Sequence, residues 1–181
     1  IEEEPLGLHH ALNLARPHVE GSRILVYFSD NITTWEMAEA VAEFNESTEP
    51  PGCALLGRQV PDPERFGVAA FNDAGELVDI IEKPEVAPSS YAVGGIYLFD
   101  ETFWDRLDAE VERQGESFTI TDLNMTYLRE GSAKLYRIDE EIWLDCGTPD
   151  ALLEAGRLAE AGRLSPLPCN LRDDDPKPSD E

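Results

Sequence analysis

The chain of 181 residues is 41% hydrophobic and carries a formal net charge of −24 at pH 7. Its length and apolar content predict one domain, or one domain with a tail. The acidic charge argues against nucleic acid as a partner, because duplex binding requires a basic surface, and no apolar run reaches the roughly 18 residues that cross a membrane.

The first predicted elements are a helix and a buried strand. Apolar residues recur at helical spacing from Leu8 to Ala15, and Pro17 is expected to end that helix. Residues 23–28 then form a continuous apolar run. Such a run is typical of a strand that is buried on both faces, as the strands of parallel sheets are.

A second helix and strand follow in the order of a β-α-β unit. Thr33 and Glu36 have the spacing of a capping box, which predicts a helix that continues to about residue 45. The prolines and the glycine at 50–52 interrupt the chain, and residues 53–60 predict the next strand. A strand, a helix and a strand in this order indicate a parallel sheet.

The pattern becomes that of a hairpin in the middle of the chain. Short strands are predicted at 66–71 and 77–81, and Gly75 lies in the turn between them. A longer strand is predicted at 91–99. Alternation between hairpin and helical patterns therefore predicts a mixed α/β protein.

Two helices and two strands complete the predicted core. One helix runs from residue 101 to about 113, and Thr121 is expected to cap another that ends at Gly131. Strands are predicted at 133–138 and at 143–144.

The last helix has a clear start signal in Thr148-Pro149-Asp150, which supplies an N-cap, a proline at the first position and an acid in the first turn. Its apolar residues are Leu152, Leu153 and Leu158. Gly162 is expected to close it. Residues 165–181 are rich in proline and aspartate and are expected to form an acidic, disordered tail.

Two aspartates lie just past predicted strands, Asp30 after 23–28 and Asp145 after 143–144. In open α/β sheets, ligands bind outside the carboxyl ends of strands. Mg²⁺ is usually held by one or two carboxylates together with substrate phosphates. Each aspartate alone has the simpler interpretation of a turn or cap residue, but the pair predicts a magnesium site in a phosphate-binding cleft.

Lys83 is a candidate phosphate ligand, because lysine occurs only here and at Lys134 and Lys177. Pro84 is expected to keep Lys83 extended, and its ammonium group would reach a phosphate as a point charge. The alternative is a solvated lysine, the commonest fate of this residue type. A chain with a charge of −24 repels anionic substrates unless the site is locally positive, which favours the phosphate interpretation.

Several glycines lie where a ligand would meet the backbone. Gly67, Gly94 and Gly95 fall within predicted strands, a position that often marks the close approach of a ligand or another backbone. A bulge or a local twist explains them equally well. Gly7 is either a loop residue or a contact between ligand and backbone.

The three cysteines, Cys53, Cys146 and Cys169, are widely spaced and predict neither a zinc site nor a disulfide framework. They favour the reducing cytoplasm, and the acidic first residues do not resemble a secretory signal. Many acids and few lysines resemble proteins of salt-loving organisms. We therefore expect the fold to need concentrated salt, which screens self-repulsion.

Seven segments occur in the order found in one family. They are Pro5-Leu6-Gly7-Leu8, Ser29-Asp30-Asn31-Ile32, Arg65-Phe66-Gly67-Val68, Glu82-Lys83-Pro84, Tyr91-Ala92-Val93-Gly94-Gly95-Ile96-Tyr97, Ile120-Thr121-Asp122-Leu123-Asn124 and Trp143-Leu144-Asp145-Cys146-Gly147-Thr148. Together they resemble the sugar-1-phosphate nucleotidyltransferases, most closely the glucose-1-phosphate thymidylyltransferases. The resemblance extends from Glu2 to about Leu164.

The resemblance implies a Rossmann-like nucleotide-diphospho-sugar transferase fold of the α/β class. It has a mixed, mainly parallel sheet with an inserted β-hairpin sugar-binding part. Residues 1–164 would form the nucleotidyltransferase core, N-terminally truncated and lacking its first βα unit. The resemblance also implies Mg²⁺ as the cofactor, a nucleoside triphosphate and a sugar 1-phosphate as ligands, and a homo-oligomer.

Site residues follow from the same motifs. Asp30 and Asp145 resemble the two metal-binding aspartates, and Lys83 resembles the lysine on the sugar phosphate. Three residues resemble sugar contacts, namely Gly67, Glu82 and Val93. Two resemble nucleotide contacts, namely Gly7 and Leu8.

Three departures from the family pattern stand out. No glycine-dense phosphate loop occurs in the chain, and the family's opening strand and loop would precede Ile1. Glu2 stands where thymidylyltransferases tend to have a glutamine near the base, which leaves the choice of base open. Ser29 and Cys146 replace a more usual glycine and threonine, and both are small enough for us to expect little effect.

The expected activity is transfer of a nucleotidyl group from dTTP to glucose 1-phosphate, with release of pyrophosphate, in nucleotide-sugar biosynthesis. No side-chain nucleophile is needed, since positioning and electrostatics provide most of the catalysis. The 181 residues by themselves are expected to be weakly active or inactive. One alternative is a non-catalytic sugar-nucleotide-binding or regulatory relative. Another is an acidic interaction domain in which the aspartates are only caps.

Overall fold

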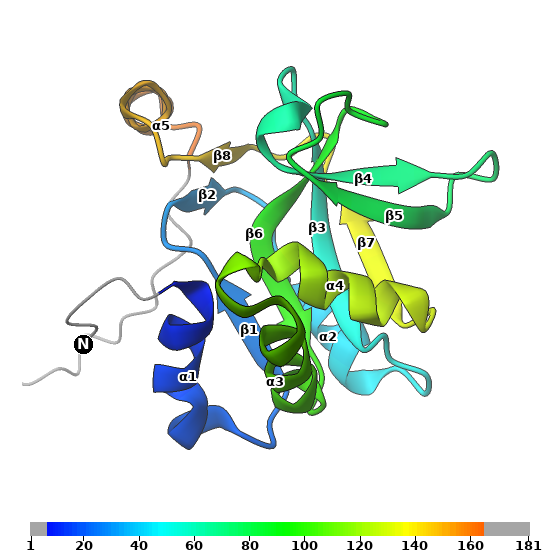
Figure 1. Cartoon of the computed structure of the whole chain (residues 1–181). Coiled ribbons are helices and arrows are strands. Elements are labelled where there is room, and N and C mark those ends of the chain that lie inside the picture. Colours follow the sequence, from blue (N-terminus) through cyan, green and yellow to red (C-terminus); the bar gives the residue numbers. More distant parts are fainter. Residues whose placement is uncertain (1–6, 165–181) are drawn as a thin grey trace, which may run out of the picture.

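The structure, a computed structural model, describes residues 7–164, and a six-stranded mixed sheet lies at its centre (Figure 1). Its strands are β5 (Leu77–Glu82), β4 (Gly67–Phe71), β6 (Tyr91–Phe99), β3 (Cys53–Gln59) and β7 (Ala133–Arg137) in sheet order, with β1 (Ile24–Tyr27) beside β6. One face of the sheet carries the larger hydrophobic core and the helices α1 (Leu8–Val19), α3 (Phe103–Gln114) and α4 (Ile120–Arg129). Helix α2 (Ala38–Glu46) lies on the other side (Figure 1).

Strand directions confirm the mixed α/β sheet. Strands β1 and β3 are both antiparallel to β6, so they run in the same direction as each other, and β3 pairs with β7 in parallel. The predicted β-α-β unit is therefore right in direction. However, β6 lies between β1 and β3, so β3–β7 is the one parallel ladder among the described strands. The expectation of a mainly parallel sheet is therefore wrong: the described sheet is mixed, and its other ladders are antiparallel.

Strand β1 is less buried than its sequence predicts. Leu25 and Tyr27 are 46% and 39% exposed, whereas Ile24 and Val26 pack against the core. Among the described strands β1 pairs only with β6, so it lies at an edge of the sheet. The expectation of a strand buried on both faces is therefore wrong here.

A two-stranded ribbon replaces the predicted capping box after Asp30. Strand β2 (Asn31–Thr33) pairs antiparallel with β8 (Trp143–Asp145). The Thr33 hydroxyl donates to the carbonyl of Ile142 at 2.9 Å, and α2 begins later, after Met37, without a side-chain cap. Pairing with a segment more than a hundred residues away overrides the local helix signal.

Helix α1 starts at Leu8 as expected, but its end differs from expectation. The helix continues past Pro17 to Val19, and the carbonyl of Arg16 accepts from the backbone N–H of Glu20 at 2.9 Å. Proline lacks an N–H and removes one helical hydrogen bond. Pro17 lies in the last turn of α1, so the helix loses little stability, because few helical hydrogen bonds follow it.

The β4–β5 hairpin is confirmed, and Gly75 adopts φ +80° in its turn. A left-handed conformation of this kind favours glycine, because it has no β-carbon. Strand β6 also forms as predicted. The hairpin extends from the main sheet beyond β6 (Figure 1), and its base borders the cavity described below.

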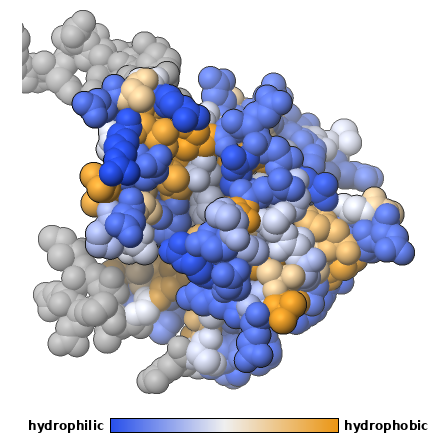
Figure 2. All heavy atoms as spheres, turned by 90° about the horizontal axis from the view of Figure 1, so that it is seen from above, coloured by the Kyte–Doolittle hydropathy of each residue, from blue (hydrophilic) through white to orange (hydrophobic). Residues whose placement is uncertain are grey.

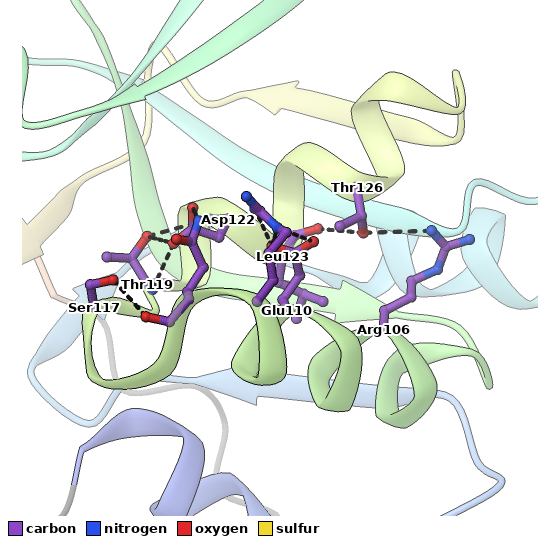
Figure 3. A network of polar contacts seen from close by, with 9 residues as sticks. Arg106, Glu110, Ser117, Thr119, Asp122, Leu123 and Thr126 are labelled. Carbon is purple, nitrogen blue, oxygen red and sulfur yellow. Dashed lines mark hydrogen bonds and ion pairs between the residues drawn. The ribbon is translucent and has the colours of Figure 1, made fainter.

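Helices α3 and α4 are held together by polar contacts (Figure 3). The cap of α4 is Thr119, which exchanges hydrogen bonds with Asp122 in a capping box. Gln114, just before the short 3-10 helix η2 (Gly115–Ser117), donates to Asp122 at 2.8 Å. The prediction that Thr121 caps this helix is wrong by two residues. Thr121 lies in the first turn instead, where its side chain is free for another contact.

Helix α5 (Pro149–Glu160) begins as predicted, with the Thr148 hydroxyl accepting from the N–H of Ala151. Its leucines are not buried, however: Leu152 and Leu153 are 61% and 56% exposed. Figure 2 shows hydrophobic atoms among hydrophilic ones on the left of the upper face, where α5 lies. No helix within residues 7–164 has the length and apolarity to span a membrane. The predicted disordered tail at 165–181 lies outside the described residues.

Candidate functional site

A cavity of about 220 Å³ lies where the β2–β8 ribbon meets β6 and the base of the hairpin. Six of the eight residues predicted for the site line it, namely Asp30, Gly67, Glu82, Lys83, Val93 and Asp145. They come from five separate segments of the chain. The structure therefore brings most of the predicted site together.

The other two predicted residues, Gly7 and Leu8, do not line this cavity. Gly7 precedes α1 with φ +94°, and Leu8 packs against the hydrophobic core. Helix α1 and β1 lie side by side and are joined by a short loop, so α1 starts near the end of β1 that leads to Asp30 (Figure 1). Their nucleotide-binding role remains a prediction.

The β2–β8 ribbon sets the relative positions of Asp30 and Asp145. Asn31 lies opposite Asp145 in the register, and the N–H of Cys146 donates to the carbonyl of Asp30 at 2.7 Å. A β-carbon on Gly147 would lie 3.0 Å from Oδ1 of Asp145 and 3.9 Å from Oδ2 of Asp30. Both carboxylates therefore border the same small space beside Gly147.

Asn31 orients Asp30 and is a site residue that the sequence did not single out. It is buried, and its Oδ1 accepts from Nε1 of Trp143 at 2.7 Å and from the N–H of Gly95 at 3.0 Å. Its Nδ2 donates to Oδ1 of Asp30 at 2.8 Å. The only sequence signal was its place after Asp30, because its other partners come from distant strands.

The paired glycines of β6 make room for these side chains. A β-carbon on Gly94 would lie 2.7 Å from Cδ2 of Leu56 and 3.0 Å from Nε1 of Trp143. The register between β3 and β6 also shifts at this point, between Leu55 and Gly57. Close approach and irregular pairing thus both occur here, and the groups that approach are side chains of the protein.

A hydrogen bond from Thr121 positions the carboxylate of Glu82. The Thr121 hydroxyl, on a residue only 6% exposed, donates to Oε2 of Glu82 at 2.6 Å. A β-carbon on Gly67 would lie 3.0 Å from that hydroxyl and 3.4 Å from Oε2. Glycine at 67 therefore keeps the floor of the cavity open, and Oε1 of Glu82 remains available to a ligand.

Lys83 has a left-handed backbone with φ +42°, which corrects the expectation that Pro84 keeps it extended. Its N–H donates to the carbonyl of Phe66 at 2.9 Å, a bond that closes the base of the hairpin. Such a conformation is uncommon for a residue other than glycine. The side chain is 69% exposed, and Nζ lies 4.0 Å from Oε1 of Glu82.

The charges lining the cavity are three carboxylates and two cations, the cations being Arg65 and Lys83. An anionic ligand therefore needs further positive charge. Two carboxylates that face one space are oxygen donors suited to Mg²⁺, which takes its remaining ligands from water and substrate. No cluster of three or more His, Cys, Asp or Glu that would hold a metal occurs among residues 7–164, so a fully protein-built cage is not formed there.

Cys146 is next to this acidic pair but is not a nucleophile in the ordinary pH range. Burial raises the pKa of its thiol, and the charges of Asp145 and Asp30 raise it further. A protonated thiol is a poor nucleophile. Cys146 is therefore not an activated nucleophile.

Comparison with known proteins identifies similar sequences. Residues 1–162 match the family model described as nucleotidyl transferase. The chain is 33% identical to a low-salt glycan biosynthesis nucleotidyltransferase of Haloferax volcanii, covering 87% of this chain and 44% of that protein. It is 35% identical to a glucose-1-phosphate thymidylyltransferase of Xanthomonas campestris pv. campestris, covering 88% of this chain and 54% of the relative. The chain thus spans about half the length of these curated relatives.

Solved structures show the same fold. A protein from Bacillus anthracis, assigned as a glucose-1-phosphate thymidylyltransferase and solved with a sucrose, superposes with a TM-score of 0.76 and 35% identity, covering 84% of this chain and 61% of that one. A UDP-glucose pyrophosphorylase solved with UDP-glucose gives 0.73 at 20% identity, covering 89% and 64%. The Rossmann-like nucleotide-diphospho-sugar transferase fold expected from the sequence is confirmed.

Proposed function

This chain belongs to the nucleotidyl transferase family, among the sugar-1-phosphate nucleotidyltransferases, and from that premise we propose that it carries the sugar-phosphate side of a nucleotidyl-transfer site. The proposed reaction joins a nucleoside triphosphate, dTTP, to a sugar 1-phosphate, glucose 1-phosphate, and releases pyrophosphate. The observation that carries the proposal is one cavity bordered by Asp30, Asp145, Glu82 and Lys83.

Each side chain has a separate role in this proposal. Lys83 binds the phosphate of the sugar phosphate as a point charge, and its exposed side chain leaves it free to do so. Glu82 accepts from a sugar hydroxyl through Oε1. The phosphate oxygen attacks the α-phosphorus while pyrophosphate leaves, so positioning supplies much of the rate.

Asp30 and Asp145 would hold Mg²⁺, and Asn31 fixes the orientation of Asp30. A bound Mg²⁺ supplies positive charge that orients phosphate oxygens and offsets developing charge. The lining of the cavity supports this need, since its carboxylates outnumber its cations. Gly7 and Leu8 are proposed as nucleotide contacts from their place at the start of α1.

The cavity is smaller than the roughly 300–1,000 Å³ of most small-molecule sites, and its lining provides two cations for several phosphate groups. We therefore expect slow turnover from these 181 residues alone. The test is pyrophosphate release from glucose 1-phosphate and Mg²⁺ with dTTP, and with UTP in parallel to decide the base. Failure to bind or turn over either pair, with the fold intact, would reject the proposal.

Replacing Thr121 with valine is expected to weaken glucose 1-phosphate binding by about tenfold. The loss of the hydroxyl leaves Oε2 of Glu82 without its donor, at a cost of about 1–3 kcal/mol. Thr121→Ser is the matched control, because it retains the hydroxyl and should bind within about threefold of the unmodified chain. Calorimetric titration of both variants measures the effect, and equal affinities would show that Thr121 does not position Glu82.

The acidic surface supports a further proposal, that the protein works in concentrated salt. A cytoplasmic location is proposed from the three widely spaced cysteines. With a net charge of −24, the melting temperature should rise as NaCl increases from about 0.1 to 1 M, over which the screening length falls from about 10 to 3 Å. Sucrose is the uncharged control. A melting temperature that does not change with NaCl, or that rises equally with sucrose, would count against the salt requirement.

A homo-oligomer is proposed from family membership alone, and light scattering tests it.

A further inference from the structure

Arg65 is the second cation lining the cavity, beside Lys83. It ends the short 3-10 helix η1 (Pro63–Arg65), and only Phe66 separates it from β4. Its guanidinium carbon lies 5.3 Å from the centroid of the Phe66 ring, and that ring meets Trp143 edge-on at 5.5 Å. Trp143 in turn donates to Asn31, so Arg65 is tied by packing to the residues that orient Asp30.

Most of the hydrogen-bonding capacity of Arg65 is unused by the described residues. Nη1 donates to Oδ2 of Asp62 at 2.7 Å, and no other side-chain hydrogen bond of Arg65 occurs within residues 7–164. A guanidinium has five N–H donors in a planar fork. Both partners of the ion pair are about half exposed, and exposed ion pairs of this kind are weak.

We propose that Arg65 is a second phosphate-binding residue of the cavity, and that Asp62 holds its guanidinium until a phosphate group of the substrate displaces it. This inference rests on the proposed function, because it takes the ligand to be a phosphorylated one. A phosphate offers the fork two oxygens and more charge than Asp62 does, so the exchange is favourable. Lys83 then binds the same anion as a point charge.

The charges around Arg65 agree with this placement. The hydrogen bond that Arg65 donates to Asp62 raises the pKa of Arg65, and the charge of Asp145 raises it further. Arg65 therefore feels the field of one carboxylate assigned to the metal.

The test measures binding of inorganic phosphate to the 181-residue chain by calorimetric titration at constant NaCl. Arg65→Gln should weaken binding by about tenfold or more, and Arg65→Lys by less, because lysine keeps the charge but loses the fork. Asp62→Asn should tighten binding by about threefold, because the competing carboxylate is gone. The control is Arg157→Gln on α5. Arg157 is exposed and does not line the cavity, so this substitution removes one positive charge away from the proposed site.

The outcomes separate this inference from the proposed function. Equal affinities for Arg65→Gln and Arg157→Gln, or no phosphate binding by the unmodified chain, would overturn the role of Arg65. Weaker binding by Asp62→Asn would overturn the displacement, since Asp62 would then support Arg65 rather than compete. If the expected order of affinities holds while no nucleoside triphosphate is turned over, the inference stands and the proposed function fails.

Discussion

Replacing Asp145 with asparagine is expected to lower Mg²⁺-dependent pyrophosphate release by about a hundredfold or more, the usual cost of losing a group that stabilises transition-state charge. Asparagine has the shape of aspartate, and its Oδ1 still accepts from the N–H of Gly147, as in the unmodified chain at 2.9 Å. The fold should therefore be preserved. What is lost is one of the two negative charges that border the space beside Gly147 and would bind Mg²⁺ together.

A binding measurement accompanies the rate. Mg²⁺ with dTTP should raise the melting temperature of the unmodified chain and leave that of Asp145→Asn unchanged, because ligands stabilise only the state that binds them. The control is Asp150→Asn. Asp150 is an exposed acid in the first turn of α5, and its substitution removes the same charge away from the site. If Asp145→Asn responds to Mg²⁺ as Asp150→Asn does, Asp145 is not a metal ligand.

Replacing Gly95 with alanine is expected to destabilise the fold by about 2–3 kcal/mol, as overpacking of a tight core does. A β-carbon there would lie 2.7 Å from Nδ2 of Asn31 and 2.8 Å from Cδ2 of Phe28. For a protein of this size, the melting temperature should fall by roughly 4–12 °C. Because Asn31 orients Asp30, metal binding should weaken in the same variant.

Gly156→Ala is the matched control for this prediction and has the opposite sign. Gly156 lies inside α5, and nothing lies within 4 Å of an added β-carbon. Alanine is about 0.5–1 kcal/mol better than glycine in a helix interior, so this variant should be more stable. Thermal melts of both variants measure the difference. Similar effects of the two substitutions would mean that the contacts around Gly95 are not close-packed.

Local signals were enough to locate much of the fold. The start of α5 at Thr148 and the hairpin turn at Gly75 were predicted because the residues that make them are adjacent in sequence. Strands β3 and β6 were predicted because a buried strand needs a continuous apolar run. The order of seven short segments indicated the family, which the comparisons confirm.

Errors occurred where a distant partner outweighed a local preference. Thr33 has a capping pattern but pairs in a strand with β8, and Lys83 precedes a proline but is turned left-handed by a bond to Phe66. Thr121 was predicted to cap a helix, but it lies in the first turn of α4 and bonds to Glu82 on β5. None of these contacts leaves a signal in the neighbouring residues.

The sequence by itself determined the residue types of the site, namely two aspartates after strands, a rare lysine and glycines inside strands. It did so because these types are required by chemistry and by backbone geometry whatever their surroundings. Only the tertiary structure decided that the aspartates face one space, that Asn31 holds Asp30 and Thr121 holds Glu82, and that Arg65 lines the same cavity. The reason is physical: these arrangements depend on hydrogen bonds and packing between segments that meet only when the chain folds.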